Sequence, residues 1–334
     1  MTTYYGLYGQ KVQYLASDPT DVQTGQVWYN STSATLKVRA ATSTAAWSSG
    51  GNLPSAKAGM GGAGTQTAGL GNGGSTGSNS TQTLLYNGST WTVSPGNMNT
   101  ARAYLSTTGT QTAAITANGA AGPYTTHSET WSGTAWTTTS PTNLNGGIRA
   151  ASGTSTSALM SGGFTGPTGS YNTTSVESWN GSSWTSVTGL NTGRTTGQGG
   201  VGTQTTALVM GGFTFPPPVN STAVESYNGT SWTNLTSMNT GRRYAGASGQ
   251  STSALIYFGT TNPPATSATS EIWNGSSWTA SATGATGREG ISGLGNSGLS
   301  TAALAFGGSS PGARSETEEY LGAGAPVTQT VTVT

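Results

Sequence analysis

A short phrase made of an aromatic residue, a turn and a tryptophan returns along this chain at nearly constant spacing. The clearest copies span residues 85–92, 130–137, 179–185, 227–233 and 273–279. Their closing tryptophans, with one earlier tryptophan, are Trp47, Trp91, Trp136, Trp184, Trp232 and Trp278, at intervals of 44, 45, 48, 48 and 46 residues. A period of this length with an aromatic hairpin in every copy is typical of four-stranded antiparallel blades. The period therefore predicts an all-β fold built from such blades.

The copy over residues 193–235 shows why each repeat predicts four strands. A glycine-rich segment leads into the apolar run 206–210, which ends at Gly211-Gly212 and suits a strand buried on both faces. Residues 224–227 then alternate in character, as a strand with one buried face does. Asn228-Gly229 supplies the positive φ of a tight hairpin, and Trp232 begins the outermost strand.

Charged residues recur in register with this pattern. A basic residue precedes the first strand of each repeat, at Lys57, Arg102, Arg149, Arg194, Arg242 and Arg288. A glutamate stands two residues before the aromatic of the third strand, at Glu129, Glu177, Glu225, Glu271 and Glu318. The first repeat has Leu84 in that place. Arg149 lies closer to its turn glycine than the other arginines do, which predicts a shortened inner strand there.

The combination of a double glycine, an aromatic, a tryptophan and a basic residue resembles the kelch motif over roughly residues 45–322. The resemblance implies a β-propeller in which the in-register charges form structural pairs between blades. It assigns that role to Arg102, Arg194, Arg242, Arg288 and the five glutamates named above.

The last repeat stops at Gly322 without its tryptophan strand. Trp47 lies ten residues before Lys57, as Trp184 lies ten before Arg194, so residues 45–48 are suited to supply that strand. The prediction is a six-bladed propeller over 45–322, closed by an N-terminal strand. Residues 1–44 form an attachment arm with a hairpin of 26–30 and 35–39, and 323–334 form a strand that pairs with another subunit or frays.

Composition excludes several classes of function. Only 6% of the residues are charged, against about 25% in ordinary proteins, and the net charge is +1. Eleven scattered basic residues make no nucleic-acid footprint. The chain shows no secretory signal at its start and no run of about 18 apolar residues, so neither secretion nor membrane insertion is expected.

Residues suited to catalysis or metal binding are scarce. The chain has no cysteine, and His127 is its one histidine. We therefore expect no catalytic residue, no metal site and no cofactor, and a protein that is not an enzyme. One alternative stays open, because Glu289 and Glu316 lie outside the repeat register and two carboxylates are what a glycosidase uses.

The loops between the second and third strands differ from repeat to repeat, whereas the other turns are uniform. Divergent loops on a regular scaffold indicate recognition. These loops contain the candidate ligand-binding residues Tyr124, His127, Phe164, Tyr171, Phe213 and Phe215. Aromatic rings among hydroxyl groups commonly hold sugars or peptides, although such rings also pack loops down.

The phrase Gly25-Gln26-Val27-Trp28-Tyr29-Asn30, continuing to Lys37 and followed by repeats rich in Thr, Gly and Asn, resembles structural proteins of tailed bacteriophages, notably marine ones. The resemblance implies a virion component made in the host cytoplasm, either a tail fibre or adhesin or a capsid decoration protein. Its expected partners are other virion proteins, bound through the arm and the C-terminal strand, further copies of itself, and a host surface glycan or protein. A cellular kelch-type binding module and a glycan-active enzyme are the alternatives.

Overall fold

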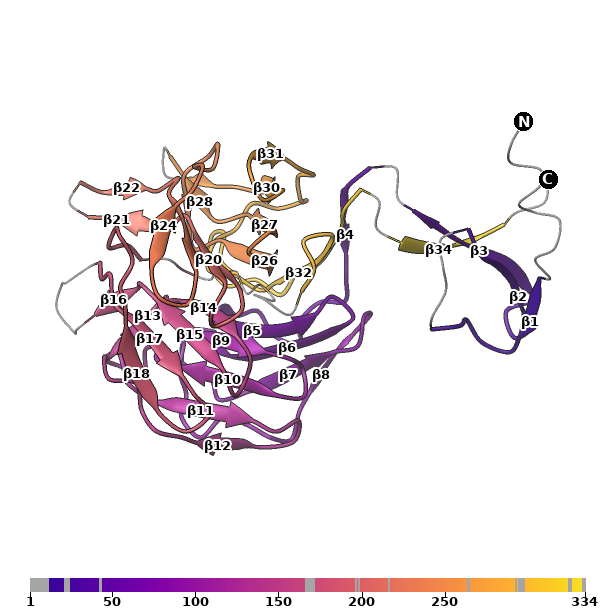
Figure 1. Ribbon diagram of the computed structural model, residues 1–334. Helices are drawn as coiled ribbons and strands as arrows, with labels where there is room; N and C mark the ends of the chain where they lie inside the picture. Colours follow the sequence, from indigo (N-terminus) through magenta and orange to yellow (C-terminus); the bar gives the residue numbers. More distant parts are fainter. Residues whose placement is uncertain are drawn as a thin grey trace. The chain divides into compact units, whose positions relative to one another are not determined.

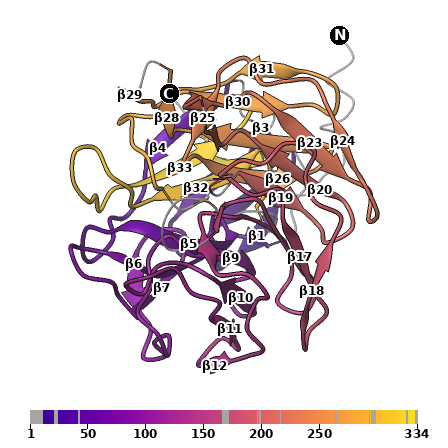
Figure 2. The same ribbon diagram turned by 90° about the vertical axis from the view of Figure 1, so that its left-hand side faces the viewer.

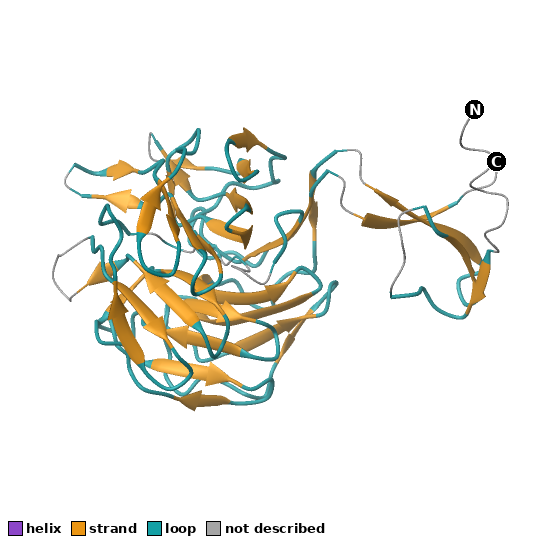
Figure 3. Cartoon of the chain, viewed as in Figure 1, coloured by secondary structure: helices purple, strands orange, loops and turns teal. Residues whose placement is uncertain are grey.

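The computed structural model describes residues 12–20, 25–41, 44–165, 172–195, 197, 199–215, 217–262, 265–291, 293, 298–323 and 326–331. Strands are the regular structure of these residues, as Figure 3 shows. None of them forms a helix with the length and apolar character needed to cross a membrane. The chain divides into two compact units. Residues Ala46–Tyr320 are named the repeat unit, and Met1–Ala45 with Leu321–Thr334 the terminal unit.

The described part of the repeat unit contains five antiparallel sheets of four strands each, one per repeat (Figure 1). Repeat 1 comprises β5 (Ala58–Thr65), β6 (Ala68–Ser75), β7 (Thr83–Tyr86) and β8 (Trp91–Val93). Repeat 2 comprises β9 (Ser106–Gly109), β10 (Ala114–Ala117), β11 (Ser128–Trp131) and β12 (Trp136–Thr138). Repeat 3 comprises β14 (Ala150–Gly153), β15 (Ala158–Ser161), β17 (Val176–Trp179) and β18 (Trp184–Val187).

Repeats 4 and 5 have the same organisation. Repeat 4 comprises β19 (Gly200–Gly202), β20 (Ala207–Met210), β23 (Val224–Tyr227) and β24 (Trp232–Asn234). Repeat 5 comprises β26 (Gly246–Gln250), β27 (Ser253–Tyr257), β30 (Ser270–Trp273) and β31 (Trp278–Ala280). In each sheet the strands follow one another in chain order, which is consistent with a β-propeller-like fold. Figure 2 shows β9, β19 and β26 towards the middle of this unit and β12, β18 and β31 at its periphery.

Repeat 6 draws its strands from both ends of the repeat unit. Its described sheet has three strands, β32 (Ala302–Phe306), β33 (Thr317–Leu321) and β4 (Ala46–Ser49), in that order. β4 carries Trp47 and lies beside β33, which is the place that the sequence predicted for residues 45–48. The segment predicted as the innermost strand of this repeat falls largely on 292 and 294–297, outside the described residues.

The aromatic hairpins form as the repeated phrase predicts. In repeat 2 the rings of Trp131 and Trp136 lie 5.4 Å apart across the turn, and in repeat 4 the rings of Tyr227 and Trp232 lie 4.9 Å apart. In repeat 4 the side-chain oxygen of Asn228 accepts hydrogen bonds from the backbone N–H groups of Thr230 and Ser231. This local bonding holds the turn, so the hairpin depends on little beyond its own residues.

A pair of residues that both have positive φ follows the second strand in repeats 2 to 6 and lies near the end of β6 in repeat 1. Glycine adopts that conformation without strain, which explains the pairs Gly73-Gly74, Gly162-Gly163, Gly211-Gly212 and Gly307-Gly308. Asn118-Gly119 and Phe258-Gly259 adopt it as well, with φ of 60° at Asn118 and 61° at Phe258. All these pairs therefore share one backbone conformation, whether or not both residues are glycine.

Beyond the pair, the chain forms short ladders with the segment that leads into the inner strand. β13 (Gly146–Gly147) pairs with β16 (Phe164–Thr165), and β25 (Arg242–Arg243) pairs with β28 (Thr260–Thr261). β28 also pairs with β29 (Ala265–Thr266), and β21 (Phe213–Thr214) pairs with β22 (Val219–Asn220). These ladders build the rim that carries the divergent loops.

The hydrophobic core lies between neighbouring sheets. One cluster joins Leu84, Tyr86 and Trp91 of repeat 1 to Leu304 and Phe306 of repeat 6. Others join repeats 1 and 2, 2 and 3, 3 and 4, and 4 and 5 in the same way. Strands such as β10, β15 and β20 are consequently buried on both faces, as their unbroken apolar or small-residue runs predict.

Neighbouring repeats are also tied together by the tryptophans of the outer strands. The indole N–H of Trp136 donates to Thr83 Oγ1 of repeat 1 at 2.8 Å, and that of Trp91 donates to Thr317 Oγ1 of repeat 6 at 2.9 Å. Trp47 in β4 donates to Ser270 Oγ of repeat 5 at 3.1 Å. Each of these indoles thus bonds to the repeat before its own, and Trp47 acts as the tryptophan of repeat 6.

The terminal unit is a four-stranded sheet in the order β1 (Gln13–Leu15), β2 (Val27–Asn30), β3 (Thr35–Ala41) and β34 (Pro326–Thr330). β2 and β3 form the hairpin that the sequence predicted. β34 pairs antiparallel with β3, with Lys37 opposite Thr330. Residues 1–44 and 323–334, treated as separate segments from the sequence, therefore contribute to one sheet, and the C-terminal strand finds a partner within its own chain.

Candidate functional site

A chain of left-handed residues runs around one end of the inner strands. Gly59 is the second residue of β5, and Tyr104, Ile148, Gly197 and Tyr244 come shortly before the inner strands of their repeats. These residues and Gly290 all have positive φ: Gly59 (63°), Tyr104 (56°), Ile148 (57°), Gly197 (63°), Tyr244 (53°) and Gly290 (60°). Backbone hydrogen bonds join them in the order Gly197, Ile148, Tyr104, Gly59, Gly290 and Tyr244, for example from Tyr104 N–H to the Gly59 carbonyl at 2.7 Å and from Gly59 N–H to the Gly290 carbonyl at 3.1 Å. We name these residues the axial residues.

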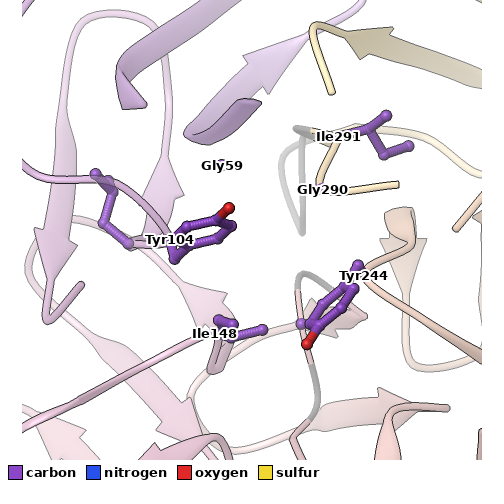
Figure 4. Close-up of a pocket in the computed structure, with 8 residues that line it drawn as sticks. Gly59, Tyr104, Ile148, Tyr244, Gly290 and Ile291 are labelled. Carbon is purple, nitrogen blue, oxygen red and sulfur yellow. The ribbon is translucent and has the colours of Figure 1, made fainter. Parts of the chain in front are cut away.

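The axial residues differ in the backbone strain that positive φ causes. Glycine adopts positive φ freely, whereas tyrosine and especially β-branched isoleucine are strained there by about 1–3 kcal/mol. Three repeats place glycine at the axial position, and three place Tyr104, Ile148 or Tyr244. Strain of this kind persists where a side chain is needed, so the axial side chains mark a candidate site. Figure 4 shows them around the pocket that they line.

A cavity of about 360 Å³ opens next to the axial residues. It is lined by Ala58, Tyr104, Tyr124, Ile148, Phe164, Tyr244, Glu289, Gly290 and Ser309. We name this cavity the aromatic cup, because four of these residues have aromatic rings. Its size suits a small ligand or one group of a larger ligand.

Two kinds of segment supply the rings. Tyr104 and Tyr244 stand on the axial positions themselves. Phe164 lies in β16, and Tyr124 follows Ala120, with which it forms a β-bridge. The ring centres of Tyr124 and Phe164 are 6.1 Å apart, and the two ring planes are inclined by 32°. Two loops from neighbouring repeats therefore contribute one shared wall of the cup.

The charges near the cup are few. Of the described residues that line it, only Glu289 is acidic, and its carboxylate accepts a hydrogen bond from the hydroxyl of Thr260. The guanidinium of Arg243 lies 5.4 Å from the centre of the Tyr244 ring and 4.6 Å from that of Phe213, but Arg243 is not part of the lining. Arg243 thus braces Tyr244 without entering the cup.

Two tyrosines of the cup, Tyr124 and Tyr244, have raised pKa values. Burial raises the pKa of Tyr124, and the neighbouring Tyr104 adds to the effect. Burial likewise raises the pKa of Tyr244, with further increases from Glu289, Tyr124 and Tyr104 and an opposing effect from Arg243. Both hydroxyls are therefore neutral at physiological pH and are available as hydrogen-bond donors.

The candidate binding residues named from the sequence divide into three groups. Tyr124 and Phe164 line the cup together. His127 is exposed, and Phe213 and Phe215 lie outside the lining, with Phe215 46% exposed. Tyr171 lies outside the described residues.

Sequence reasoning missed Tyr104 and Tyr244. The signal was present, because both stand two residues after an in-register arginine, in Arg102-Ala103-Tyr104 and Arg242-Arg243-Tyr244. The equivalent positions after Lys57 and Arg288 hold Gly59 and Gly290. Alternation of glycine with large residues at one repeat position indicates positive φ.

The in-register charges form five buried ion pairs. They are Arg102–Glu129 (2.6 Å), Arg149–Glu177 (2.5 Å), Arg194–Glu225, Arg242–Glu271 (3.0 Å) and Arg288–Glu318 (2.5 Å). The kelch resemblance implied pairs between blades, but each pair closes within one repeat, between the segment entering the inner strand and the third strand. Burial lowers the pKa of Arg102, Arg149 and Arg242, and the partner glutamates oppose this shift.

The reason for this geometry lies at the double-glycine position. There the second strand leaves its ladder, and its carbonyl groups need new donors. Each arginine donates to the carbonyl of the first residue at the double-glycine position of its repeat. Arg194 Nε donates to Gly211 O at 2.9 Å, and Arg102 Nη1 donates to Asn118 O at 2.8 Å. Arg149 comes directly after the axial residue Ile148 in the sequence, yet its Nε reaches Gly162 O at 3.1 Å.

The inner strand that follows Arg149 is not shortened. β14 has four residues, like β9, so the predicted shortening of that inner strand was wrong.

The two carboxylates considered for catalysis do not line the cup together. Glu289 lines the cup, whereas Glu316 pairs with Arg314 at 3.4 Å and is not part of the lining. In the described part of the chain, no three His, Asp or Glu side chains gather in a group able to hold a metal ion.

Two comparisons with known proteins gave no likeness. No protein-family model matches this chain, and no curated protein matches it.

Proposed function

We propose that this chain is a non-enzymatic structural protein of a tailed bacteriophage particle, in which a six-bladed β-propeller recognises a ligand on the host surface. The propeller corresponds to the repeat unit, with β4 completing the sixth blade. The terminal unit attaches it to the particle. The observation that carries recognition is the aromatic cup, which places four rings and one carboxylate on the face of the divergent loops.

Contacts between repeats support the six-bladed architecture. The inner strands β5, β9, β14, β19 and β26 contact one another in sequence, and β32 contacts both β26 and β5. The indole bonds of Trp91 to repeat 6 and of Trp47 to repeat 5 continue the pattern of the other repeats through the place where the ring must close. In a closed ring of this kind only short, protected sheet edges remain.

The placement on a phage particle rests on the sequence. The phrase from Gly25 to Lys37 and the neutral, hydroxyl-rich composition resemble phage structural proteins. The terminal sheet, in which β3 carries Lys37 and pairs with β34, gives the attachment segment a fold of its own.

Immunogold labelling of purified virus particles tests the location, with an antibody raised against the full chain. Gold at the tail supports an adhesin, and gold over the head supports a decoration protein. Unlabelled particles, with the protein recovered only from cell fractions, would overturn the virion assignment and favour a cellular binding module.

Competition for the host surface tests recognition. Soluble full-length protein added in excess should slow the adsorption of particles to host cells, and the Tyr104→Gly variant should not. Equal inhibition by both proteins would place recognition outside the aromatic cup.

A further inference from the structure

The wall of the aromatic cup consists largely of aromatic rings with one acidic group. The aromatic rings of Tyr104, Tyr124, Phe164 and Tyr244 line it, and Glu289 adds one negative charge. Among the described residues that line the cup, none is a lysine or an arginine. Beyond the glutamate, their side-chain polar groups are the tyrosine hydroxyls and that of Ser309. Such a wall attracts a cation and disfavours an anion.

Two of the rings that line the cup stand on axial residues that are not neighbours. Going from Tyr244 through hydrogen-bonded neighbours, Gly290 and Gly59 come before Tyr104. Beyond Tyr104, the hydrogen bonds lead to Ile148 and then to Gly197. Tyr104 and Tyr244 are therefore separated by two axial residues, and Figure 4 shows their rings on different sides of a second pocket, which shares both tyrosines with the cup.

Both tyrosines are kept at strained positions that glycine fills in other repeats. Tyr104 is 43% exposed, so packing alone does not account for its side chain. A tyrosine with positive φ and a partly exposed side chain is suited to contact a ligand. The same position in repeats 1 and 6 is Gly59 and Gly290, and the ring of Tyr104 lies over Gly59, where an added Cβ would meet it at 2.9 Å.

From these observations we infer that the aromatic cup binds a quaternary ammonium group about the size of choline. The inference deepens the proposed recognition function and rests on it. The methyl groups lie against the faces of the rings, and Glu289 balances the positive charge. A sugar is a poorer match, because sugar sites need several planar polar side chains along the ring edge, and this lining offers few.

A pair of nearly isosteric ligands tests the role of charge. Calorimetric titration of the full chain with choline and with neutral 3,3-dimethylbutan-1-ol compares the same shape with and without the cation. Choline should bind roughly tenfold more tightly. Equal affinity for the two, or binding of the neutral alcohol alone, would overturn the inference.

Variants of the cup locate the binding site. Glu289→Gln should weaken choline binding roughly tenfold and leave the affinity for dimethylbutanol unchanged. Tyr104→Gly should weaken the binding of both choline and dimethylbutanol. It should also stay folded, because three repeats already have glycine at this position, and its thermal unfolding checks this. Phe215→Ala removes an exposed aromatic ring outside the lining and should bind choline like the unaltered protein. Unchanged choline binding in both cup variants would overturn the site.

Further ligands separate this inference from the proposed function. Phosphocholine and Nε-trimethyllysine carry the same group as it occurs on lipids or glycans and on proteins, and tighter binding of either supports the inference and names the source. Binding of a neutral monosaccharide that Tyr104→Gly abolishes, with no binding of choline, would overturn the inference and leave recognition by the cup standing. Adsorption that Tyr104→Gly protein inhibits as strongly as the unaltered protein would instead place host recognition outside the cup and overturn the role proposed for the cup in it.

Discussion

Repeat 1 and repeat 4 solve the same packing problem with different chemistry. In repeat 4 the buried Arg194 pairs with Glu225 and donates to the Gly211 carbonyl. In repeat 1 the equivalent residues are Lys57 and Leu84. Lys57 is 2% exposed, its Nζ donates to Ser80 Oγ at 2.9 Å, and Leu84 packs against Phe306 and Trp91.

The difference shows what the ion pairs contribute. Glu225 also accepts the backbone N–H of Asn191 at 2.7 Å, so one carboxylate holds both the guanidinium and the incoming segment. Repeat 1 folds around an apolar cluster without that carboxylate, at the cost of a buried ammonium group whose pKa burial lowers. Ion pairs and apolar packing are thus alternative ways of filling this place, as buried pairs in other proteins are.

Removing the carboxylate from repeat 4 should have the largest effect. Glu225→Ala leaves Arg194 charged and buried without its partner, so the free energy of unfolding should fall by about 3–5 kcal/mol. Chemical denaturation of the full chain measures it. Ser226→Ala, at the half-buried next position of β23, serves as the control and should change stability by less than about 0.5 kcal/mol. A loss below about 1 kcal/mol for Glu225→Ala would show that the pair is dispensable.

Placing a carboxylate in repeat 1 tests whether the geometry is shared. Leu84→Glu should be tolerated better when Lys57 is present than in a Lys57→Met background, because the new carboxylate lies where the other repeats have theirs. A double-mutant cycle should give a favourable coupling of about 1–3 kcal/mol. Additive effects would mean that Lys57 does not reach the position of the missing glutamate.

Lys57→Met tests, through the pH dependence of stability, what the buried lysine costs repeat 1. The variant removes a buried charge and should be about 1–2 kcal/mol more stable than the unaltered protein near neutral pH. Burial holds the folded-state pKa of Lys57 below its ordinary value of 10.5, so the unfolded chain binds more protons between these two values. The unaltered protein should therefore gain stability relative to the variant as pH rises towards 10.5. If the difference in the free energy of unfolding between the two proteins did not change with pH, Lys57 would not be buried as a cation.

The ion pair of the terminal unit should matter least. Lys37 pairs with Asp18 at 2.7 Å, and hydrogen bonds from Lys37, Asn30 and Trp28 lower the pKa of Asp18 to about 2. Because Asp18 is partly exposed, the pair should contribute less than about 1 kcal/mol. That contribution is present above 3.8, the ordinary pKa of an aspartate, and is lost as pH falls towards 2. NMR titration should show a higher Asp18 pKa in Lys37→Gln, and an unchanged value would assign the shift to Asn30 and Trp28.

The sequence predicted what is local or strictly repeated. The hairpin of Asn228 and Trp232, the double glycines and the place of β4 all follow from short patterns in register. The aromatic cup was predicted in part, through Tyr124 and Phe164, because their loops visibly diverge. Tyr104 and Tyr244 were missed because their backbone conformation leaves no mark within one repeat.

Long-range pairing was harder to predict. The alternating strand 326–330 has no local feature that names β3 as its partner, so pairing with another subunit or fraying was expected. Arg149 shows the same limit, since its side chain reaches the common position from a different place in the chain.

The pairing of β4 with β33 has a consequence for folding during protein synthesis. Trp47 in β4 is made before the other strands of the repeat unit, whereas the strand beside it, β33, is made after the strands of repeats 1 to 5. Until then Trp47 lacks its neighbour Tyr320, 5.2 Å away in the finished fold. The repeats can form one after another during translation, but the sixth sheet is completed only after β33 has emerged. A chain truncated before residue 317 would lack β33, so β4 would have no partner strand in this sheet.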